Sequence, residues 1–160
     1  MMKAMFIGTV SAGKTTLIQK LCETELKYDK TQAVEYVHEF IDTPGEYMQV
    51  RAFWCSLTVT SYDADIICLV QDSTSEDCWF SGGIRTKFAK PVLGIVTKID
   101  RKDADVILAK EYLEYAGCDE VLCVSALDGT GIQELKVGMN NLVQEYYDSW
   151  RNRCATNYYD

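Results

Sequence analysis

The stretch Gly8-Thr9-Val10-Ser11-Ala12-Gly13-Lys14-Thr15 decides the fold of this 160-residue chain. It fills every fixed place of the pattern Gly-x-x-x-x-Gly-Lys-Ser/Thr, in which the glycines let the backbone wrap tightly around phosphate groups. The apolar run Met5-Phe6-Ile7 precedes it, and a helix-like segment with Thr16, Leu17 and Leu21 follows it. The sequence therefore predicts a phosphate-binding loop between a strand and a helix.

Each residue type in this loop suits a contact with a nucleoside triphosphate. Inward-pointing backbone N–H groups and the positive end of the following helix favour the phosphates. Lys14 is expected to reach the β and γ phosphates, and the hydroxyl of Thr15 to ligate Mg²⁺. The residues expected at the phosphates are Gly8, Ser11, Ala12, Gly13, Lys14, Thr15 and Thr16.

Apolar runs at residues 5–7, 66–70, 92–96 and 121–124 read as strands buried on both faces. Strands of that kind form parallel sheets covered by helices. The sequence predicts an α/β protein with the three-layer P-loop NTPase fold of small GTPases, its mostly parallel central sheet carrying helices on both faces.

Apolar residues recur at helical spacing over residues 106–116 and 132–150, with Asp103 as a candidate cap and Gly117 as a candidate stop for the first helix. We expect one nucleotide-binding domain over residues 1–150 and a frayed tail over residues 151–160, although a docking role for the tail stays open.

The composition disfavours some classes of binding partner and indicates the cellular compartment. With 24 acidic and 16 basic residues the net charge is -8, which disfavours nucleic acids and anionic membranes. The 7 cysteines form no CxxC pair and no regular framework, which favours reduced cytosolic thiols. No run is long enough to span a membrane, and too few apolar residues precede Gly8 for a signal peptide. We expect a cytoplasmic protein.

Asp42-Thr43-Pro44-Gly45 ends the strand-like run 39–41 and is a plain turn when taken alone. Downstream of a phosphate loop, Asp42 becomes a candidate for the Mg²⁺ site, and Gly45 for an N–H contact with the γ-phosphate. Thr31 is the best candidate for a switch threonine that closes on both, with an ordinary loop threonine as the alternative. The predicted metal set is Thr15, Thr31 and Asp42, with a compact hairpin between the last two.

Thr97-Lys98-Ile99-Asp100 follows a strand-like run and decides which base is bound. The carboxylate of Asp100 can accept the N1–H and the 2-amino hydrogens of guanine, whereas adenine has no such donors. The stem of Lys98 can cover the base plane. Ser125 is expected to orient Asp100, and the Ala126 N–H to face the guanine carbonyl, with Leu127 beside them. The ligands expected are GTP or GDP with Mg²⁺.

Glu46 stands where many small GTPases carry the glutamine that orients the attacking water. A carboxylate cannot donate to that water and is repelled by the γ-phosphate, so we expect slow intrinsic hydrolysis. Residues 27–39 contain no arginine to act as an internal finger. An arginine in trans, self-association as a homodimer, and Glu46 acting as a base stay open as routes to activation. The residues expected to act in hydrolysis are Lys14, Thr31, Gly45 and Glu46.

Four segments carry a resemblance to a known family: Lys30-Thr31-Gln32-Ala33, Phe40-Ile41-Asp42-Thr43-Pro44-Gly45-Glu46-Tyr47, Asp63-Ala64-Asp65-Ile66 and Pro91-Val92-Leu93-Gly94-Ile95-Val96-Thr97-Lys98-Ile99-Asp100. From about residue 3 to 142 the chain resembles TRAFAC-type GTPases, and more narrowly the EutP/PduV family of small GTPases from bacterial ethanolamine and propanediol utilisation. The resemblance implies the nucleotide site described above, with Thr97 ordinary at its place. It also implies association with a bacterial microcompartment, through its shell or enzymes, and a regulatory or assembly role.

Three functional classes stay open: a hydrolysing GTPase switch, a GTP- or GDP-dependent interaction module that scarcely turns over, and a P-loop kinase acting on a small acid such as acetate. The kinase is the least favoured, because such enzymes need clustered lid arginines. The chain has only Arg51, Arg85, Arg101, Arg151 and Arg153.

Overall fold

The computed structural model describes residues 2–24 and 31–156. The elements follow in the order β1 (Ala4–Ile7), α1 (Lys14–Leu21), β2 (Glu35–Val37), β3 (Phe40–Asp42), α2 (Glu46–Gln49), the 3-10 turn η1 (Arg51–Phe53), α3 (Trp54–Ser61), β4 (Ile66–Asp72), the 3-10 turn η2 (Ile84–Lys87), β5 (Val92–Thr97), α4 (Val106–Ala116), β6 (Glu120–Cys123) and α5 (Ile132–Thr156). Within these residues, no helix is both long and apolar enough to cross a bilayer.

One six-stranded sheet forms the centre of the molecule, in the order β2-β3-β1-β4-β5-β6. Every neighbouring pair is parallel except β2 with β3. Because the carboxyl ends of the parallel strands meet at one edge, residues that follow β1, β3, β4 and β5 are brought together there. The predicted α/β class with a mostly parallel sheet is confirmed.

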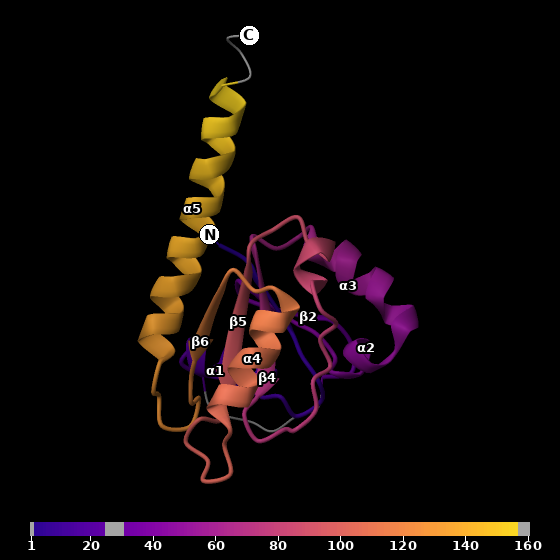
Figure 1. Ribbon diagram of the computed structural model, residues 1–160, viewed down its shortest axis with the longest axis vertical. Coiled ribbons are helices and arrows are strands. Elements are labelled where there is room, and N and C mark those ends of the chain that lie inside the picture. Colours follow the sequence, from indigo (N-terminus) through magenta and orange to yellow (C-terminus); the bar gives the residue numbers. More distant parts are fainter. Residues whose placement is uncertain (1, 25–30, 157–160) are drawn as a thin grey trace.

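Helices cover both faces of the sheet, which buries alternate side chains of each central strand in opposite cores. Met5 and Ile7 of β1 pack with residues of α2, α3 and α4 on one face. Ala4 and Phe6 pack with residues of α1 and α5 on the other. Figure 1 shows α2, α3 and α4 apart from α5, which runs along its own side of the sheet. The predicted three layers are confirmed.

The predicted compact hairpin is present at the sheet edge. Strands β2 and β3 pair antiparallel with Val37 opposite Phe40, so only His38 and Glu39 form the turn. His38 takes up a positive φ of 54°, as tight hairpin turns of this length require. The hairpin leads the chain from Thr31 back to Asp42 in few residues.

Helix α4 begins at a different residue from the one predicted. Asp105, not Asp103, is the cap, and its Oδ1 accepts the Leu108 N–H at 2.9 Å. Asp103 instead accepts hydrogen bonds from Arg101. The backbone selects Asp105, because its N–H is held by the Ser73 carbonyl at 2.7 Å. Gly117 ends the helix in the left-handed conformation, with φ 87°, as predicted.

Helix α5 is longer than the sequence pattern indicates. The pattern predicts a frayed end from Arg151, yet the helix continues to Thr156, so that prediction is wrong for the first residues of the tail. Residues 157–160 lie outside the described part of the chain. Tyr146 donates to the Ala89 carbonyl at 2.6 Å, and Tyr147 donates to Asp65 at 2.9 Å. Past these contacts α5 extends beyond the sheet (Figure 1). The division into residues 1–150 and a tail stays a prediction.

Candidate functional site

The phosphate loop follows β1 at the carboxyl edge of the sheet, where the sequence predicted it. Gly13 has φ 92° and Ser11 has φ 64°, so the loop uses left-handed conformations at both positions. Gly8 touches the neighbouring strand: a Cβ there would lie 2.5 Å from the Val70 carbonyl oxygen. Only glycine at position 8 lets the loop start this close to β4.

Lys14 reaches back across the loop. Its Nζ donates to the carbonyls of Gly8 and Thr9, each at 2.8 Å, and only 6% of the residue is exposed. Burial lowers the pKa of Lys14 to about 8, against the opposing pull of the carboxylates of Asp42 and Glu46. A partly desolvated amine is thus held at the centre of the loop, where phosphates would meet it.

The three residues predicted to hold a metal meet at one point. Thr15 Oγ1 donates to Asp42 Oδ2 at 2.5 Å, and Thr31 Oγ1 donates to the same oxygen at 2.8 Å. The two threonine hydroxyls are 3.0 Å apart. In the candidate switch segment, residues 27–39, residues 27–30 lie outside the described part of the chain, and Lys30 is among them.

The donor set at this point suits a hard cation. Asp42 Oδ1 is buried and has no hydrogen-bond partner, so one carboxylate oxygen is left for a ligand. Hydroxyl and carboxylate oxygens are what Mg²⁺ takes, together with phosphate oxygens of a substrate. Among the described residues no group of three His, Cys, Asp or Glu side chains forms an all-protein metal cage.

Gly45 lies directly against the phosphate loop. A Cβ at this position would lie 2.1 Å from the Val10 nitrogen and 2.5 Å from the Thr9 carbonyl carbon. Thr43 fixes the approach, because its hydroxyl donates to the Phe6 carbonyl at 2.7 Å. Glu46 follows as the first residue of α2, and its charge acts on Lys14. The segment from Thr43 to Glu46 is therefore in contact with the loop.

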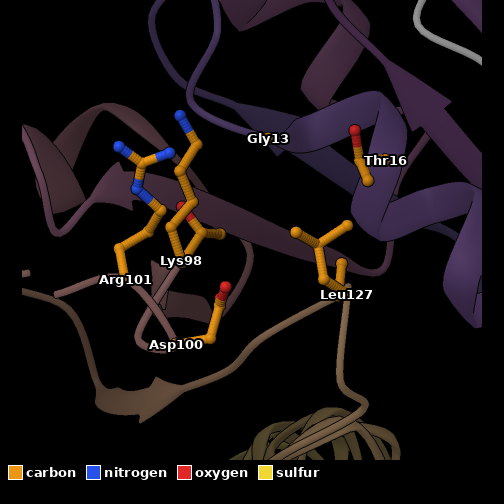
Figure 2. A pocket seen from close by; sticks show the side chains of 8 residues that line it. Gly13, Thr16, Lys98, Asp100, Arg101 and Leu127 are labelled. Carbon is orange, nitrogen blue, oxygen red and sulfur yellow. The ribbon is translucent and has the colours of Figure 1, made fainter.

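A cavity adjoins the phosphate loop at Gly13 and Thr16. It has a volume of about 210 Å³ and is lined by Gly13, Thr16, Thr97, Lys98, Asp100, Arg101, Ala126 and Leu127. Figure 2 shows Lys98, Asp100 and Arg101 on one wall, facing Thr16 and Leu127. The structure thus brings together five of the six predicted base-recognition residues, and Ser125 does not line the cavity. The sequence analysis did not predict that Arg101 lines this cavity. The one sequence feature that points to it is its position directly after Asp100.

Thr97 joins this pocket to the phosphate loop. Its hydroxyl donates to the Ala12 carbonyl at 2.7 Å, although the two residues are 85 positions apart. Ser125 is fully buried, and its Oγ accepts the Asp128 N–H at 3.3 Å. The expected role of Ser125 in orienting Asp100 stays a prediction, because its described partner is Asp128.

Lys98 pairs with Asp72, which does not line the pocket and belongs to none of the sequence motifs. Its φ is 59°, and its Nζ lies 2.5 Å from Asp72 Oδ2. Asp72 Oδ1 accepts the N–H and the hydroxyl of Thr74, each at 2.8 Å. Burial works to raise the pKa of Asp72, but the hydrogen bonds from Lys98 and Thr74 outweigh it and lower that pKa.

A mostly parallel sheet with this loop at its carboxyl edge defines a P-loop protein of the α/β class. Within that class, the chain belongs to the PduV-EutP family, described as "Ethanolamine utilisation - propanediol utilisation", whose model matches residues 1–141.

Relatives of known name support this membership. The chain is 38% identical over 141 residues to the "Propanediol utilization protein PduV" of Citrobacter freundii, covering 88% of this chain and 94% of that protein. It is 31% identical over 138 residues to the "Probable acetate kinase EutP" of Escherichia coli K12, covering 84% and 87%.

A solved structure shares the fold at low sequence identity. The Methanosarcina barkeri Roco2 RocCORdC structure bound to GDP superposes with a TM-score of 0.60 at 18% identity. The match covers 90% of this chain but only 49% of the Roco2 chain.

Proposed function

We propose that this protein is a guanine-nucleotide-binding switch that hydrolyses GTP slowly and serves an ethanolamine- or propanediol-type utilisation system. The observation that carries the proposal is the meeting of Thr15, Thr31 and Asp42 at one oxygen, next to Lys14. These residues come from the phosphate loop, the switch segment and the end of β3. A site built from all three segments couples nucleotide phosphates to chain conformation.

The base is guanine in this proposal, because Asp100 is the one acidic residue that lines the pocket among the described residues. A carboxylate accepts the N1–H and the 2-amino hydrogens of guanine, and adenine would place an acceptor against it. Lys98 covers the base with its stem, and the Ala126 N–H serves the guanine carbonyl. Thr97 sets the distance between base and phosphates through its bond to Ala12.

The γ-phosphate is sensed by Lys14, by the hydroxyl of Thr31 and by the N–H of Gly45. Thr15, Thr31 and Asp42 would hold Mg²⁺, whose charge offsets that of the phosphates when it is bound. Because Thr31 and Gly45 reach this point from separate segments, losing the γ-phosphate removes a partner from both. GTP and GDP therefore favour different positions of these segments.

Hydrolysis is slow in this proposal because position 46, where many small GTPases carry the glutamine that orients the attacking water, holds a glutamate. Glu46 follows Gly45 but is a carboxylate, which the γ-phosphate repels. Of the arginines with described side chains, Arg85 is held by Asp119 and Phe88, Arg101 lies at the base pocket, and Arg151 and Arg153 lie on α5. An activator that brings an arginine, or a second copy of the chain, would raise the rate.

Nucleotide titration tests the base assignment. Wild type should bind labelled GTP and GDP at least about a thousandfold more tightly than ATP. Asp100→Asn should shift the preference toward xanthine nucleotides, because the amide donates to the C2 carbonyl of xanthine. Tight ATP binding with weak GDP binding, or unchanged guanine affinity in Asp100→Asn, contradicts the proposal.

Phosphate release from GTP, compared between wild type and Glu46→Gln, tests the slow rate. We expect wild type to be slow and the glutamine variant to be no slower. A fast wild type that collapses on this substitution would instead make Glu46 the catalytic base. A wild type with no turnover, even with cell components added, would favour an interaction module over a switch.

A kinase acting on acetate is the second candidate, favoured by the name "Probable acetate kinase EutP" that the Escherichia coli relative carries. It needs cations that hold a carboxylate beside the γ-phosphate. Lys14 supplies one such cation at the phosphate loop. Acetyl phosphate, trapped with hydroxylamine after incubation with acetate and GTP or ATP, would support the kinase. Acetate-independent phosphate release would support the switch.

The family also bears on where the protein works. We place it in the cytoplasm, with the shell or enzymes of a microcompartment as candidate partners, and keep a homodimer as one route to activation. Nucleic acids and membranes are disfavoured by the net charge of -8. Co-sedimentation with purified microcompartments in GTP and in GDP tests this placement.

A further inference from the structure

Asp100 shares the candidate base pocket with two cations. Lys98 and Arg101 line the same pocket, and Figure 2 shows their side chains beside it. An exposed carboxylate that shares a pocket with an ammonium and a guanidinium can pair with either of them. Over residues 2–24 and 31–156, however, the side chain of Asp100 forms no hydrogen bond and no ion pair, because both cations bind elsewhere.

Each cation is held by another carboxylate. Lys98 Nζ lies 2.5 Å from Asp72 Oδ2. Arg101 donates to Asp103 through Nε at 3.0 Å and through Nη2 at 3.3 Å. This pairing is the chief cause that raises the pKa of Arg101, and the charge of Asp100 contributes less.

The ion pairs made by Asp103 and Asp72 differ in their exposure to water. Asp103 and Arg101 are both more than half exposed, so their pair is screened by water. Only 13% of the Asp72 side chain is exposed, and Thr74 fixes its second oxygen with two further hydrogen bonds. Asp72 ends β4 directly opposite Thr97, so its position is set by the sheet itself. It does not line the pocket.

We propose that Asp72 is a positioning residue for base specificity, which binds the Lys98 ammonium and so leaves Asp100 open to the hydrogens of guanine. The proposal rests on the proposed function, since it takes guanine as the base. Without Asp72, Lys98 is free to turn to Asp100 and compete with guanine for the same oxygens. Adenine offers no hydrogen-bond donors to Asp100 in this proposal, so a pair between Lys98 and Asp100 would not lower the affinity for adenine nucleotides.

The test compares Asp72→Asn with wild type by displacement of labelled GDP with unlabelled GDP and ADP. The preference for GDP over ADP should fall about fivefold, the worth of an exposed ion pair of about 1 kcal/mol. In a Lys98→Met background the same substitution should leave the preference unchanged, because the stem remains and the competing charge is gone. Asp77→Asn is the matched control, with an equal charge change at an exposed position of the next loop.

Equal losses of GDP and ADP affinity in Asp72→Asn would mean a structural role only and would overturn the proposal, while the proposed function stands. A loss of preference that persists in the Lys98→Met background overturns it in the same way. A wild type that prefers ADP overturns the proposed function, and the role of Asp72 with it. A nucleotide-free readout is the Lys98 ammonium signal in nitrogen NMR: its slow hydrogen exchange with water should be lost in Asp72→Asn, and fast exchange in wild type contradicts the pair.

Discussion

Thr31 Oγ1 donates a hydrogen bond to Asp42 Oδ2 at 2.8 Å, so the candidate switch residue touches the candidate metal carboxylate directly. Thr31 is only 9% exposed in this position. The contact ties the segment that precedes the β2–β3 hairpin to the end of β3. A substitution at Thr31 should therefore weaken the binding of the metal and the γ-phosphate more than the binding of the base.

Thr31→Ala should reduce GTP affinity about tenfold and GDP affinity by less than about twofold, because a hydrogen bond near charged groups contributes about 1.5 kcal/mol and serves only the γ-phosphate state. Equilibrium binding of both labelled nucleotides with Mg²⁺ present measures it. Thr24→Ala, at an exposed hydroxyl that bonds the Gln19 carbonyl, is the control. Equal weakening for both nucleotides would rule out a switch role for Thr31.

Gly45→Ala should remove the preference for GTP over GDP. The added methyl would lie 2.1 Å from the Val10 nitrogen, so the segment must move away from the phosphate loop. Overpacking of this kind costs about 1–3 kcal/mol, and we expect a matching loss of stability in urea unfolding. Gln49→Ala, at an exposed position of α2, should change neither quantity. An unaltered GTP preference in Gly45→Ala is the contrary result.

Nucleotide affinity should depend on pH through Lys14. The pKa of this amine is lowered to about 8 in the free protein, and bound phosphates favour its protonated form. Binding therefore takes up a proton above that pH, and GDP affinity should fall by up to about tenfold per pH unit there. Titrations between about pH 6.5 and about pH 9 measure the slope, while the ordinary lysine pKa would give none. A flat wild-type profile would falsify the assignment.

The Lys14 amine also makes the stability of the fold depend on pH, with the opposite sign: stability rises with pH where nucleotide affinity falls. Its folded pKa of about 8 lies below the ordinary 10.5. Between these values the unfolded chain binds more protons, so the contribution of Lys14 to the free energy of unfolding rises with pH in that window. Lys14→Met removes both dependences, and its comparison with wild type isolates them from other titrating groups.

Asp105→Ala should destabilise the protein by about 1 kcal/mol, because it removes the side-chain cap of α4. Asp103→Ala should cost less than about 0.5 kcal/mol, since it breaks only an exposed ion pair. Urea unfolding of the two variants makes the comparison. The reverse order of stability would place the cap at Asp103 after all.

Local patterns predicted the candidate site residues that lie within one segment. The phosphate loop, Asp42 with Gly45, and Lys98 with Asp100 are short motifs whose spacing has a direct physical meaning. Continuous apolar runs predicted the buried parallel strands, because such strands must be apolar on both faces. The cavity lined by Lys98 and Asp100 follows from both, since its residues come from segments next to strand ends that a parallel sheet brings together.

Features that depend on contacts across the sheet could not be predicted in this way. The pair of Lys98 and Asp72 joins residues 26 positions apart, and it requires the register that places Asp72 opposite Thr97. Asp103 and Asp105 are equally good caps by type, and only the Ser73 carbonyl distinguishes them. The tail lacks apolar periodicity, but extending an existing helix costs little, so α5 passes through it.

Helix α5 begins beside the loop that supplies Ala126 and Leu127, and it ends beyond Tyr146 and Tyr147 at the opposite edge of the sheet. Its 25 residues span about 37 Å at the ordinary rise of an α-helix. Cargo, a label or a surface joined beyond this helix would therefore lie about one helix length from the candidate nucleotide site. Under the proposed function, attachment at that end and exchange of the nucleotide would not obstruct each other.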